Sequence, residues 1–577
     1  MTRLWNVPAE FADEMVDGFV AANGRYVRRV PGGVVRSTVS PDEQVAVVIG
    51  GGSGHYPAFA GLVGQGLAHG AAMGNLFASP SAQQVFSVAR AAAADGGVLL
   101  TYGNYAGDVM NFNAAQERLV EQGINAQTVL VTDDVKSAPV SEKHKRRGIA
   151  GDLTVFRAAA AAAEAGYALD AVVQVAQKAN ERTRSFGVAF SGCTLPGEAS
   201  PLFSVPDGRM AVGLGIHGEP GIDEVDIPSA DELAEQLVAT LLDPAEIPDG
   251  VGQVEGARVI PVLNGLGSLK YEEMFVVYRR IAQLLEQAGI VVVDPHVGEY
   301  CTSFDMAGTS LTLYWLDDEL EQLWQRPVDS PAYRRGSVTP AARVSSEVTG
   351  EDEQTQAIPD SDESSRAVAG TVTSALSAIV AVIDENAEEL GRIDSIAGDG
   401  DHGIGMQRGA HAALAAATSA HEAGAGAQTV LTRAADAWSD KAGGTSGVLW
   451  GVILEGVAKH LGDTGRPSSA DVVAGVAAGR EGVTRYGKAE VGDKTLVDAL
   501  VPFSTSLAEQ VAAGARLRDA WPVAAQAAST AAQATADLLP RLGRARTHGE
   551  HSVGTPDPGA VSLALIATVV GRVLAEF

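Results

Sequence analysis

The first 325 residues alternate between short apolar runs and longer alanine-rich stretches. The apolar runs are rich in β-branched residues and occupy residues 45–49, 98–100, 128–131 and 290–293. Strands that alternate with helices in this way predict an α/β domain. The uninterrupted alanines at 158–163 fit a closely packed helix, because apolar and charged residues continue the pattern on both sides.

From residue 367 onward the pattern changes to long segments rich in alanine and leucine, separated by turn residues. No run of β-branched residues comparable to those of the first half lies between them. Such long helical patterns predict an all-α domain. The expected helical segments are 367–390, 405–423, 429–440, 471–485, 495–513, 520–539 and 558–577.

Residues 326–366 separate the two halves and differ from both in composition. This segment is rich in proline, serine and threonine, has an acidic run at 351–353, and contains no Leu, Met, Phe or Trp. A segment that cannot bury apolar surface stays flexible. We therefore expect a domain at 1–325, a flexible linker at 326–366 and a second domain at 367–577.

The charge balance excludes two classes of partner. The chain of 577 residues has 42 Lys and Arg against 71 Asp and Glu, a formal net charge of -29. Such a charge repels both nucleic acid and anionic membranes.

Cys193 and Cys301 are the only cysteines, so no disulfide framework is expected. With acidic residues near the N-terminus and no apolar stretch of about 20 residues near the C-terminus, we expect a soluble cytoplasmic protein.

Two glycine-containing loops follow predicted strands of the first half. Residues 50–57 read GGGSGHYP, so backbone N–H groups of Gly52, Ser53 and Gly54 can approach a phosphate or a polar ligand next to His55. Asp108 lies in the loop that follows the strand at 98–100. Ligands of α/β sheets gather at the carboxyl ends of strands, so Asp108 and His55 are candidates for acid–base work. The alternatives are a purely steric glycine turn and a helix cap.

A third segment of the first half contains a histidine with glycines on both sides. His217 lies in the segment GLGIHGEPG at 213–221. A histidine that is not crowded by bulky neighbours can present a ring nitrogen to a substrate. His217 is therefore a further candidate for the chemistry of the first half.

The helical half has a glycine-rich loop with three carboxylates, Asp394, Asp399 and Asp401. Carboxylates this close repel one another unless a cation lies among them, and Mg²⁺ prefers carboxylate and phosphate oxygens. The alternative is an acidic loop exposed to solvent. The loops GGTSG at 443–447 and GDKT at 492–495 offer backbone amides, hydroxyls and a lysine for a phosphate group.

Two other stretches resemble nucleotide motifs less closely. Residues 482–488 fit GxxxxGK, but Ala489 replaces the hydroxyl residue that binds the metal and no strand precedes, so a Walker A loop is rejected. Arg544 and Asp557 lie in loops near the C-terminus that suit a nucleotide, although a surface loop before a helix would look the same.

Taken together, these loops resemble the single-chain, ATP-dependent dihydroxyacetone kinase family over nearly the whole chain. That family joins a ketose-binding K domain to a helical, nucleotide-binding L domain. The matching stretches are GGGSGH at 50–55, NYAGDVMNF at 104–112, RRGIAG at 146–151, GIHGEPG at 215–221, FDMAGTSLT at 304–312, GDGDHG at 398–403, GGTSG at 443–447, GDKTLVDAL at 492–500 and PDPGA at 556–560.

The resemblance implies a role for each candidate residue. His217 would bond covalently to the carbonyl carbon of a short ketose, Asp108 would accept the proton of a terminal hydroxyl, and His55 would assist. Asp394, Asp399 and Asp401 would hold Mg²⁺ on the phosphates of ATP. The residues implied around the nucleotide are His402, Gly403, Gly443, Gly444, Thr445, Ser446, Lys494, Thr495, Arg544 and Asp557.

The resemblance also implies an architecture and an assembly. The K domain would consist of two α/β lobes, and the L domain would be an antiparallel helical barrel. The chain would form a homodimer in which the L domain of one chain covers the K domain of its partner. Because transfer needs the reacting atoms within a few ångström, we also expect the domains to close on ATP binding.

The sequence departs from the family's pattern on the ketose side. Tyr56, Phe59 and Ala106 stand where Glu, His and Thr are common, and Gly103 stands where Lys often occurs. A glycine in place of lysine favours a larger ketose beside Gly103, so erythrulose is preferred over dihydroxyacetone as the substrate. The alternatives are a dihydroxyacetone kinase and, in another class, a ketose-binding regulatory protein or one that depends on a phosphoprotein of the phosphotransferase system.

Overall fold

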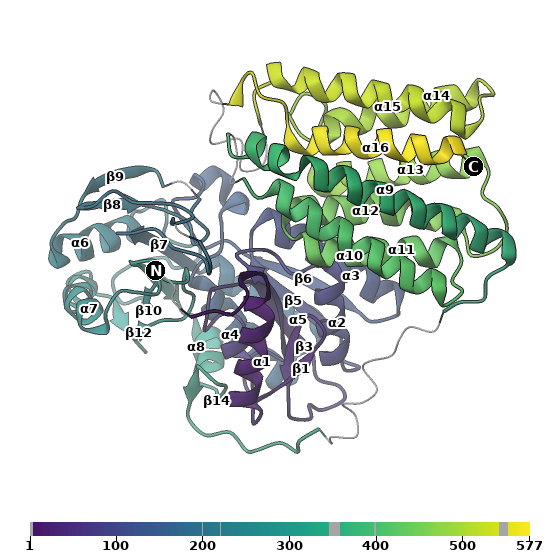
Figure 1. The fold of residues 1–577 in the computed structure, drawn as a ribbon. Helices are drawn as coiled ribbons and strands as arrows, with labels where there is room; N and C mark the ends of the chain where they lie inside the picture. The colour runs from purple at the N-terminus through teal and green to yellow at the C-terminus, as the bar shows by residue number, and fades with distance from the viewer. Residues whose placement is uncertain are drawn as a thin grey trace. The chain divides into compact units, whose positions relative to one another are not determined.

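The chain divides into two compact units, Met1–Asp352 and Glu353–Phe577, each with its own hydrophobic core. Figure 1 shows the computed structural model, which describes residues 4–198, 200–219, 221–344, 358–396, 400–541 and 552–576. The first unit is α/β and the second is helical, which confirms the predicted fold class.

The first sheet of the α/β unit has the strand order β1-β2-β4-β3-β5-β6. Strands β4, β3, β5 and β6 run parallel, while β2 joins β4 and β1 joins β2 in antiparallel pairs. The parallel strands are buried, as expected for a sheet with helices on both faces. The strands are β1 Val27–Val30, β2 Gly33–Arg36, β3 Ala46–Ser53, β4 Gly70–Leu76, β5 Val98–Gly103 and β6 Ala126–Val131.

Two pairs of helices cover this sheet. Helices α2 (Ala82–Ala92) and α3 (Ala106–Glu121) pack on one face, and α4 (Gly151–Glu164) and α5 (Leu169–Glu181) pack on the other. Helix α1 (Phe11–Asn23) lies beside β1. The 3-10 turns of this unit are η1 Pro8–Glu10, η2 Ala60–Leu62 and η3 Val140–Lys145.

The second sheet has the order β11-β10-β13-β7-β8-β9, with β12 also pairing with β10. It is mixed, because β10, β13, β7, β8 and β9 pair in antiparallel fashion and β11 and β12 run parallel to β10. Helices α6 (Ala230–Leu241) and α7 (Tyr271–Gln287) bury one face of this sheet. The remaining elements are β7 Thr183–Ala189, β8 Arg209–Val212, β9 Asp223–Asp226, β10 Arg258–Gly265, β11 Val291–Val292, β12 His296–Gly298, β13 Gly308–Trp315 and α8 Asp318–Trp324.

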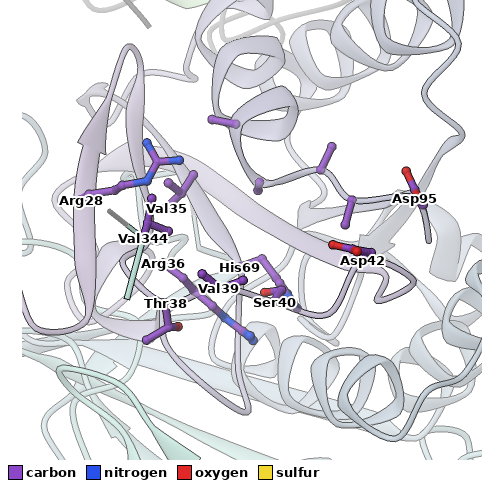
Figure 2. Close-up of a pocket in the computed structure, with 14 residues that line it drawn as sticks. Arg28, Val35, Arg36, Thr38, Val39, Ser40, Asp42, His69, Asp95 and Val344 are labelled. Atoms are coloured by element: carbon purple, nitrogen blue, oxygen red, sulfur yellow. The ribbon is translucent and has the colours of Figure 1, made fainter. Parts of the chain in front are cut away.

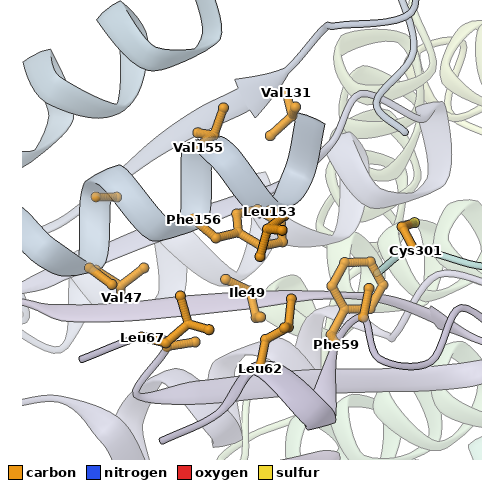
Figure 3. Packing of buried hydrophobic residues seen from close by; sticks show 14 of the residues in the cluster. Val47, Ile49, Phe59, Leu62, Leu67, Val131, Leu153, Val155, Phe156 and Cys301 are labelled. Atoms are coloured by element: carbon orange, nitrogen blue, oxygen red, sulfur yellow. The ribbon is translucent and has the colours of Figure 1, made fainter. Parts of the chain in front are cut away.

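Helix α4 lies between the two sheets. It contacts β3, β5 and β6 of the first sheet and β7 and β13 of the second, and its six alanines at 158–163 are all buried. Small side chains allow a helix to approach neighbours closely on several sides. Figure 3 shows Leu153 and Phe156 of this helix packed against Ile49 of β3. The alanine run thus forms part of the contact that joins the two lobes.

A buried ion pair also links the lobes. Arg146, 1% exposed and just before α4, donates through both terminal nitrogens to the two carboxylate oxygens of Glu246, each at 2.7 Å. Glu246 follows α6 in the second lobe. A guanidinium and a carboxylate that pair with good geometry fix the relative position of the two segments that carry them. Removal of either side chain would leave the other as an unpaired buried charge.

The second unit is a closed ring of helices within its described residues. Each helix packs on the next along the chain, and α16 returns to α9, so the ring closes around one core (Figure 1). The helices are α9 Glu363–Asp394, α10 His402–Glu422, α11 Ala427–Ala442, α12 Gly444–Leu461, α13 Ser469–Gly487, α14 Val497–Ala512, α15 Leu517–Ala534 and α16 Pro558–Glu576, with a 3-10 turn η5 at Thr535–Asp537. The stretch at 482–488 that resembled a Walker A loop falls largely inside α13.

The segment at 326–366 is more structured at its ends than its composition predicts. Strands β14 (Val328–Asp329) and β15 (Arg334–Arg335) form a hairpin against the first unit, with Val328 and Tyr333 buried. At the other end α9 begins at Glu363, where Asp362 accepts a capping hydrogen bond from the Ser365 amide at 2.8 Å. Residues 345–357 lie outside the described part of the chain.

Helices α9 and α16 are long and apolar enough, by composition, to cross a membrane. Both contribute side chains to the core of the helical unit, and the core helices of soluble proteins pass the same test.

Cys193 and Cys301 are free and buried.

Candidate active site

The predicted ketose loops meet at the carboxyl ends of the parallel strands in the first sheet. The glycines at 50–52, predicted as a loop, lie inside β3, which leads directly to His55, and β5 ends at Gly103, just before the helix that carries Asp108. Glycine is necessary at these positions, either because a neighbouring side chain lies too close for a Cβ atom or because the backbone has a positive φ. A side chain at Gly51 would place its Cβ 2.6 Å from Phe59, and Gly54 has a φ of +102°, which disfavours other residues.

His55 is buried, with 1% of its surface exposed, and both ring nitrogens are engaged. Its Nδ1 lies 2.7 Å from the carbonyl oxygen of Thr302, and its Nε2 lies 2.9 Å from Nε2 of His217. Phe77 stacks on the ring at 5.1 Å between centroids. Burial, and then the neighbouring His217, lower the pKa of His55 to about 3.

His217 is held by the glutamate two residues along the chain. Its Nδ1 lies 3.1 Å from Oε1 of Glu219, and its backbone amide donates to Oε2 of the same carboxylate at 3.1 Å. Burial alone would raise the pKa of Glu219, but His217 and Arg147 outweigh burial and lower it, so Glu219 is ionised. Tyr105 packs edge-on against the His217 ring at 4.5 Å.

These contacts decide where the protons of the two histidines lie. The carbonyl of Thr302 and the carboxylate of Glu219 can only accept, so Nδ1 of each ring carries a hydrogen. The two Nε2 atoms then hydrogen-bond at 2.9 Å only if they share one further proton. A ring nitrogen that carries no proton presents a lone pair, which is the form required of a nucleophile.

Asp108 lies in the first turn of α3 and is 7% exposed. Burial raises its pKa to about 6, although a hydrogen bond from Ser79 and the charge of His217 act in the opposite direction. Its Oδ1 has no hydrogen-bond partner among the described residues. The electrostatic effect of His217 on Asp108 shows that the structure brings the two groups to the same region, together with His55.

The remaining predicted substrate residues play more structural parts. The Ser53 hydroxyl is buried and donates to the Gly74 carbonyl at 2.6 Å, so it is already occupied. A Cβ at Gly52 would lie 2.8 Å from the amide of Ala78, so this position needs glycine for packing. Beside Gly103 the space is filled, because a Cβ there would lie 3.1 Å from the ring of Tyr105.

Three residues that organise this site were missed by the sequence reasoning. Glu219 lies inside the glycine-flanked motif of His217, only two residues along the chain, so its carboxylate could have been identified from the spacing as a partner of the ring. Thr302 acts through its backbone carbonyl, which no sequence pattern reveals. Arg147 approaches Glu219 at 3.7 Å and pairs with Asp134 at 2.9 Å.

In the helical unit, the starts of four alternate helices carry the predicted nucleotide residues. His402 is the first residue of α10, Gly444 starts α12, and Lys494 and Asp557 lie just before α14 and α16. Hydrogen bonds and electrostatic effects connect these positions, so they lie at one end of the ring. Helix N-termini that converge in this way bind anions through free amides and aligned dipoles.

His402 connects three of these helices. Its amide donates to Oδ2 of Asp394 at 3.1 Å, its Nε2 lies 3.0 Å from the Ser562 hydroxyl of α16, and its Nδ1 lies 3.3 Å from the Ser446 hydroxyl of α12. Burial lowers the pKa of His402, with Asp394 acting against it. The ring is therefore occupied by protein groups, which favours a positioning role.

The predicted metal ligands are partly brought together. Asp401 is exposed, but the protein packed around it, and then the carboxylate of Asp394, raise its pKa to about 6. Burial, followed by Asp498 and Asp394, raises the pKa of Asp557 to about 7. Carboxylates that destabilise one another's charge fit a site for a divalent cation. In the described part of the chain no three such side chains form a ready metal cluster, and Asp399 lies outside it.

The phosphate loops differ in their construction. Gly443 and Gly444 both have positive φ, 66° and 58°, at the start of α12, and a Cβ on Gly444 would meet open space. Thr445 is exposed there, so its hydroxyl and the free amides of this turn face outward. Gly403, in contrast, is needed for helix packing, because a Cβ would lie 2.0 Å from the carbonyl oxygen of Ala387.

The loop of Lys494 is shaped by a buried carboxylate. Asp498, 5% exposed, accepts from the amides of Gly492 at 2.6 Å and Thr495 at 2.7 Å. The Lys494 ammonium donates to the carbonyls of Ser552 at 2.7 Å and Leu538 at 3.1 Å. Burial lowers the pKa of Lys494, with Asp557 acting against it.

The Thr-x-x-Asp spacing at 495–498 is a capping signal that could have identified Asp498. Arg544 lies outside the described residues.

A separate cavity of about 280 Å³ lies in the first unit between β1, β2 and the end of α2. Figure 2 shows Arg28, Arg36 and His69 among its lining residues. None of the predicted site residues lines this cavity.

Comparison with known proteins finds a known domain family for each unit. The model of the Dak1 domain matches residues 17–332, and the model of the DAK2 domain matches residues 396–571. The chain is 59% identical to the L-erythrulose kinase of Pectobacterium atrosepticum over 100% of this chain and 97% of that one. It is 53% identical to the D-erythrulose kinase of Mycolicibacterium smegmatis over 99% and 98%. The dihydroxyacetone kinase from C. freundii, solved in complex with AMP-PNP and Mg²⁺, matches with a TM-score of 0.52 and 28% identity over 100% of this chain and 99% of that one.

Fold and comparisons together define a two-domain kinase, with an α/β unit that matches the Dak1 domain and a helical unit that matches the DAK2 domain. The chain belongs to the dihydroxyacetone kinase family. It is an ATP-dependent ketose kinase whose cofactors are ATP and Mg²⁺.

Replacement of Asp498 tests the phosphate loop. In Asp498→Ala the amides of Gly492 and Thr495 lose their acceptor, so we expect the Kd for Mg-ATP to rise about tenfold while ketose binding is unchanged. Titration calorimetry on the full chain measures both. Asp471→Ala is the matched control, because Asp471 accepts the same kind of capping bond at the start of α13. Unchanged ATP affinity in Asp498→Ala would contradict the assignment.

Proposed function

We propose that this chain phosphorylates a terminal primary hydroxyl of erythrulose with ATP, with the ketose held covalently on His217. The observation that carries the proposal is the contact between Nε2 of His217 and Nε2 of His55, in a setting where each Nδ1 already donates to a fixed acceptor. Such an arrangement presents one nitrogen lone pair and one mobile proton to a carbonyl group.

The covalent step balances with the groups present. Nε2 of His217 adds to the ketose carbonyl carbon, the π pair of the carbonyl moves to oxygen, and that oxygen takes the proton shared by the two rings through His55. The low pKa of His55 makes it an effective proton donor at this moment. The positive charge left on the His217 ring is stabilised by the carboxylate of Glu219. A polyol without a carbonyl cannot be held in this way.

Asp108 is the proposed base for the phosphoryl transfer. It accepts the proton of the terminal hydroxyl as that oxygen forms its bond to the γ-phosphorus and the bond to ADP breaks. A pKa raised to about 6 keeps Asp108 ionised at neutral pH and still basic enough to accept a proton.

The helical unit supplies the nucleotide site of the proposal. Asp394, Asp399 and Asp401 would hold Mg²⁺, which offsets the charge of the phosphates as the γ-phosphoryl group moves. The amides of Gly443, Gly444, Thr445 and Ser446 would bind phosphate oxygens at the start of α12. His402, Gly403, Lys494, Thr495, Arg544 and Asp557 would shape the surroundings of the nucleotide.

Erythrulose is preferred over dihydroxyacetone for two reasons. The curated relatives that cover nearly the whole chain at 51–59% identity carry the names L- and D-erythrulose kinase. On the ketose side, Gly103 provides no cation, whereas Lys often occurs at this position in the family. We further propose a cytoplasmic homodimer, for which the two free cysteines fit a reducing compartment.

A substrate panel tests the proposed activity. Purified protein with Mg-ATP is given dihydroxyacetone, D-erythrulose, L-erythrulose, glyceraldehyde and glycerol, and ADP release is measured in a coupled assay. We expect the highest kcat/KM with one erythrulose enantiomer and no turnover with glycerol. Turnover of dihydroxyacetone alone would replace the substrate, and no turnover of any ketose would favour a regulatory or phosphoprotein-dependent role.

Replacement of His217 tests the covalent attachment. His217→Ala removes the only group proposed to bond the ketose, so we expect at least a 100-fold loss of kcat/KM for ketose with unchanged affinity for ATP. The exposed His144 provides the control variant His144→Ala. Near-normal ketose turnover by His217→Ala would disprove the covalent role.

The pH dependence tests the base. Because the pKa of Asp108 is raised to about 6, its carboxylate is present above this pH and is lost below it. We expect kcat/KM for ketose to fall about tenfold per pH unit below pH 6. Asp401 and Asp557 also have raised pKa values, so ATP affinity is measured over the same range. A profile that follows ATP affinity alone would assign the change to the helical unit.

A further inference from the structure

The ring of Phe77 contacts both histidines of the proposed ketose site. Phe77 directly follows β4 and is 8% exposed. Its ring stacks on the ring of His55, with the centroids 5.1 Å apart and the planes at 20°. It lies perpendicular to the ring of His217, at 5.5 Å and 89°. Among the described residues, the ring of Phe59 contacts His55 but not His217. The ring of Tyr105 contacts His217 but not His55.

The backbone of Phe77 has a conformation that only its surroundings can explain. Its φ is +52°, in the left-handed region that residues other than glycine rarely adopt. Such strain persists where the surrounding structure requires it, and it is frequent at functional sites. In this conformation the Phe77 amide donates to the carbonyl of Ser53 at 2.9 Å. A glycine would adopt the same turn without strain, so the turn alone does not account for a phenylalanine.

Phe304 provides a comparison within the same site. It also has a left-handed backbone, with a φ of +55°, and its amide donates to the carbonyl of Gly54 at 2.8 Å. Its ring, however, packs against Phe11 of helix α1 at 5.9 Å, and none of its described ring contacts is with a histidine. Phe77 and Phe304 therefore both tie the backbone that leads to His55, and Phe77 adds a ring contact to the histidine pair.

The plane of the His55 ring decides where its Nε2 lies. The hydrogen bond from Nδ1 to the Thr302 carbonyl restrains one side of the ring, so a tilt of the plane would still move Nε2 on the other side. An aromatic ring stacked on its face opposes that tilt, because offset-stacked rings keep their planes nearly parallel. With the plane held, Nε2 of His55 lies 2.9 Å from Nε2 of His217.

We propose that Phe77 is a positioning residue for the covalent capture of the ketose, whose ring holds the planes of His55 and His217 so that their Nε2 atoms stay aligned for addition to the carbonyl carbon. This role rests on the proposed ketose kinase function. It deepens that function by naming a residue that bonds neither ketose nor ATP and acts through the two histidines. A misplacement of about 1 Å near a reacting atom costs on the order of 100-fold in rate.

Carbon-13 NMR of captured ketose tests this role. The full-length protein is titrated with erythrulose labelled at the carbonyl carbon, and the fraction present as a protein-bound tetrahedral carbon is measured, with free ketone and hydrate identified in a sample without protein. Phe77→Leu keeps an apolar side chain without a flat face, and Phe77→Gly relieves the strained turn but removes the ring. In both variants we expect capture to weaken about tenfold and kcat/KM for ketose to fall about tenfold, with KM for ATP unchanged.

Phe304→Leu is the matched control, because it makes the same exchange at the same kind of backbone away from the histidine rings. Its capture and kcat/KM should stay within about twofold of the wild type. Thermal unfolding identifies a variant that does not fold, and the other Phe77 variant then decides. Capture by a folded Phe77 variant within twofold of the wild type, or an equal loss in Phe304→Leu, would overturn the positioning role. A wild type that forms no adduct at all contradicts the proposed covalent attachment instead.

Discussion

The contact between His55 and His217 is the interaction on which the proposed chemistry of the ketose site depends. Their Nε2 atoms lie 2.9 Å apart, and each Nδ1 is committed to an acceptor that cannot donate in return. In the proposed mechanism the proton passes to the ketose oxygen only as Nε2 of His217 bonds to the carbonyl carbon, because the oxygen becomes basic in that step. This constraint requires that loops from both sheets of the α/β unit meet with an accuracy of a few tenths of an ångström.

The remainder of the α/β unit can be understood as support for that contact. His55 follows a strand of the first sheet, whereas Thr302, its acceptor, follows β12 of the second sheet. Ser303 donates to the carbonyl of Ile216 at 2.6 Å and so ties the loop of His217 to the same segment. The alanine-rich helix α4 and the buried pair of Arg146 with Glu246 hold the two lobes together.

In the helical unit, helix N-termini that attract anions lie close to several carboxylates. The starts of α10, α12, α14 and α16 gather at one end of the ring, where their amides attract an anion. Asp394, Asp401 and Asp557 lie among them, and the charge of Asp394 adds to burial in raising the pKa values of Asp401 and Asp557. Phosphate groups and a divalent cation would satisfy both sets of groups at once. The unit thus favours the metal nucleotide over either component alone.

The sequence by itself determined the fold class and the family, and it predicted candidate residues for both sites, because these follow from local patterns. Hydrophobic periodicity distinguishes strands from helices, and glycine loops after strands mark where a backbone can approach a ligand. The same patterns did not reveal the packed hairpin at 328–335, whose burial depends on contacts with distant parts of the unit. They also favoured open space beside Gly103, where the structure places the ring of Tyr105.

Only the tertiary structure decided that Thr302 and Glu219 set the tautomers of the histidines, that Asp498 shapes the loop of Lys494, and that Asp152 is buried without a described partner. Those features depend on atoms brought together from positions far apart in the chain or on backbone groups, and neither leaves a pattern in the order of the residues.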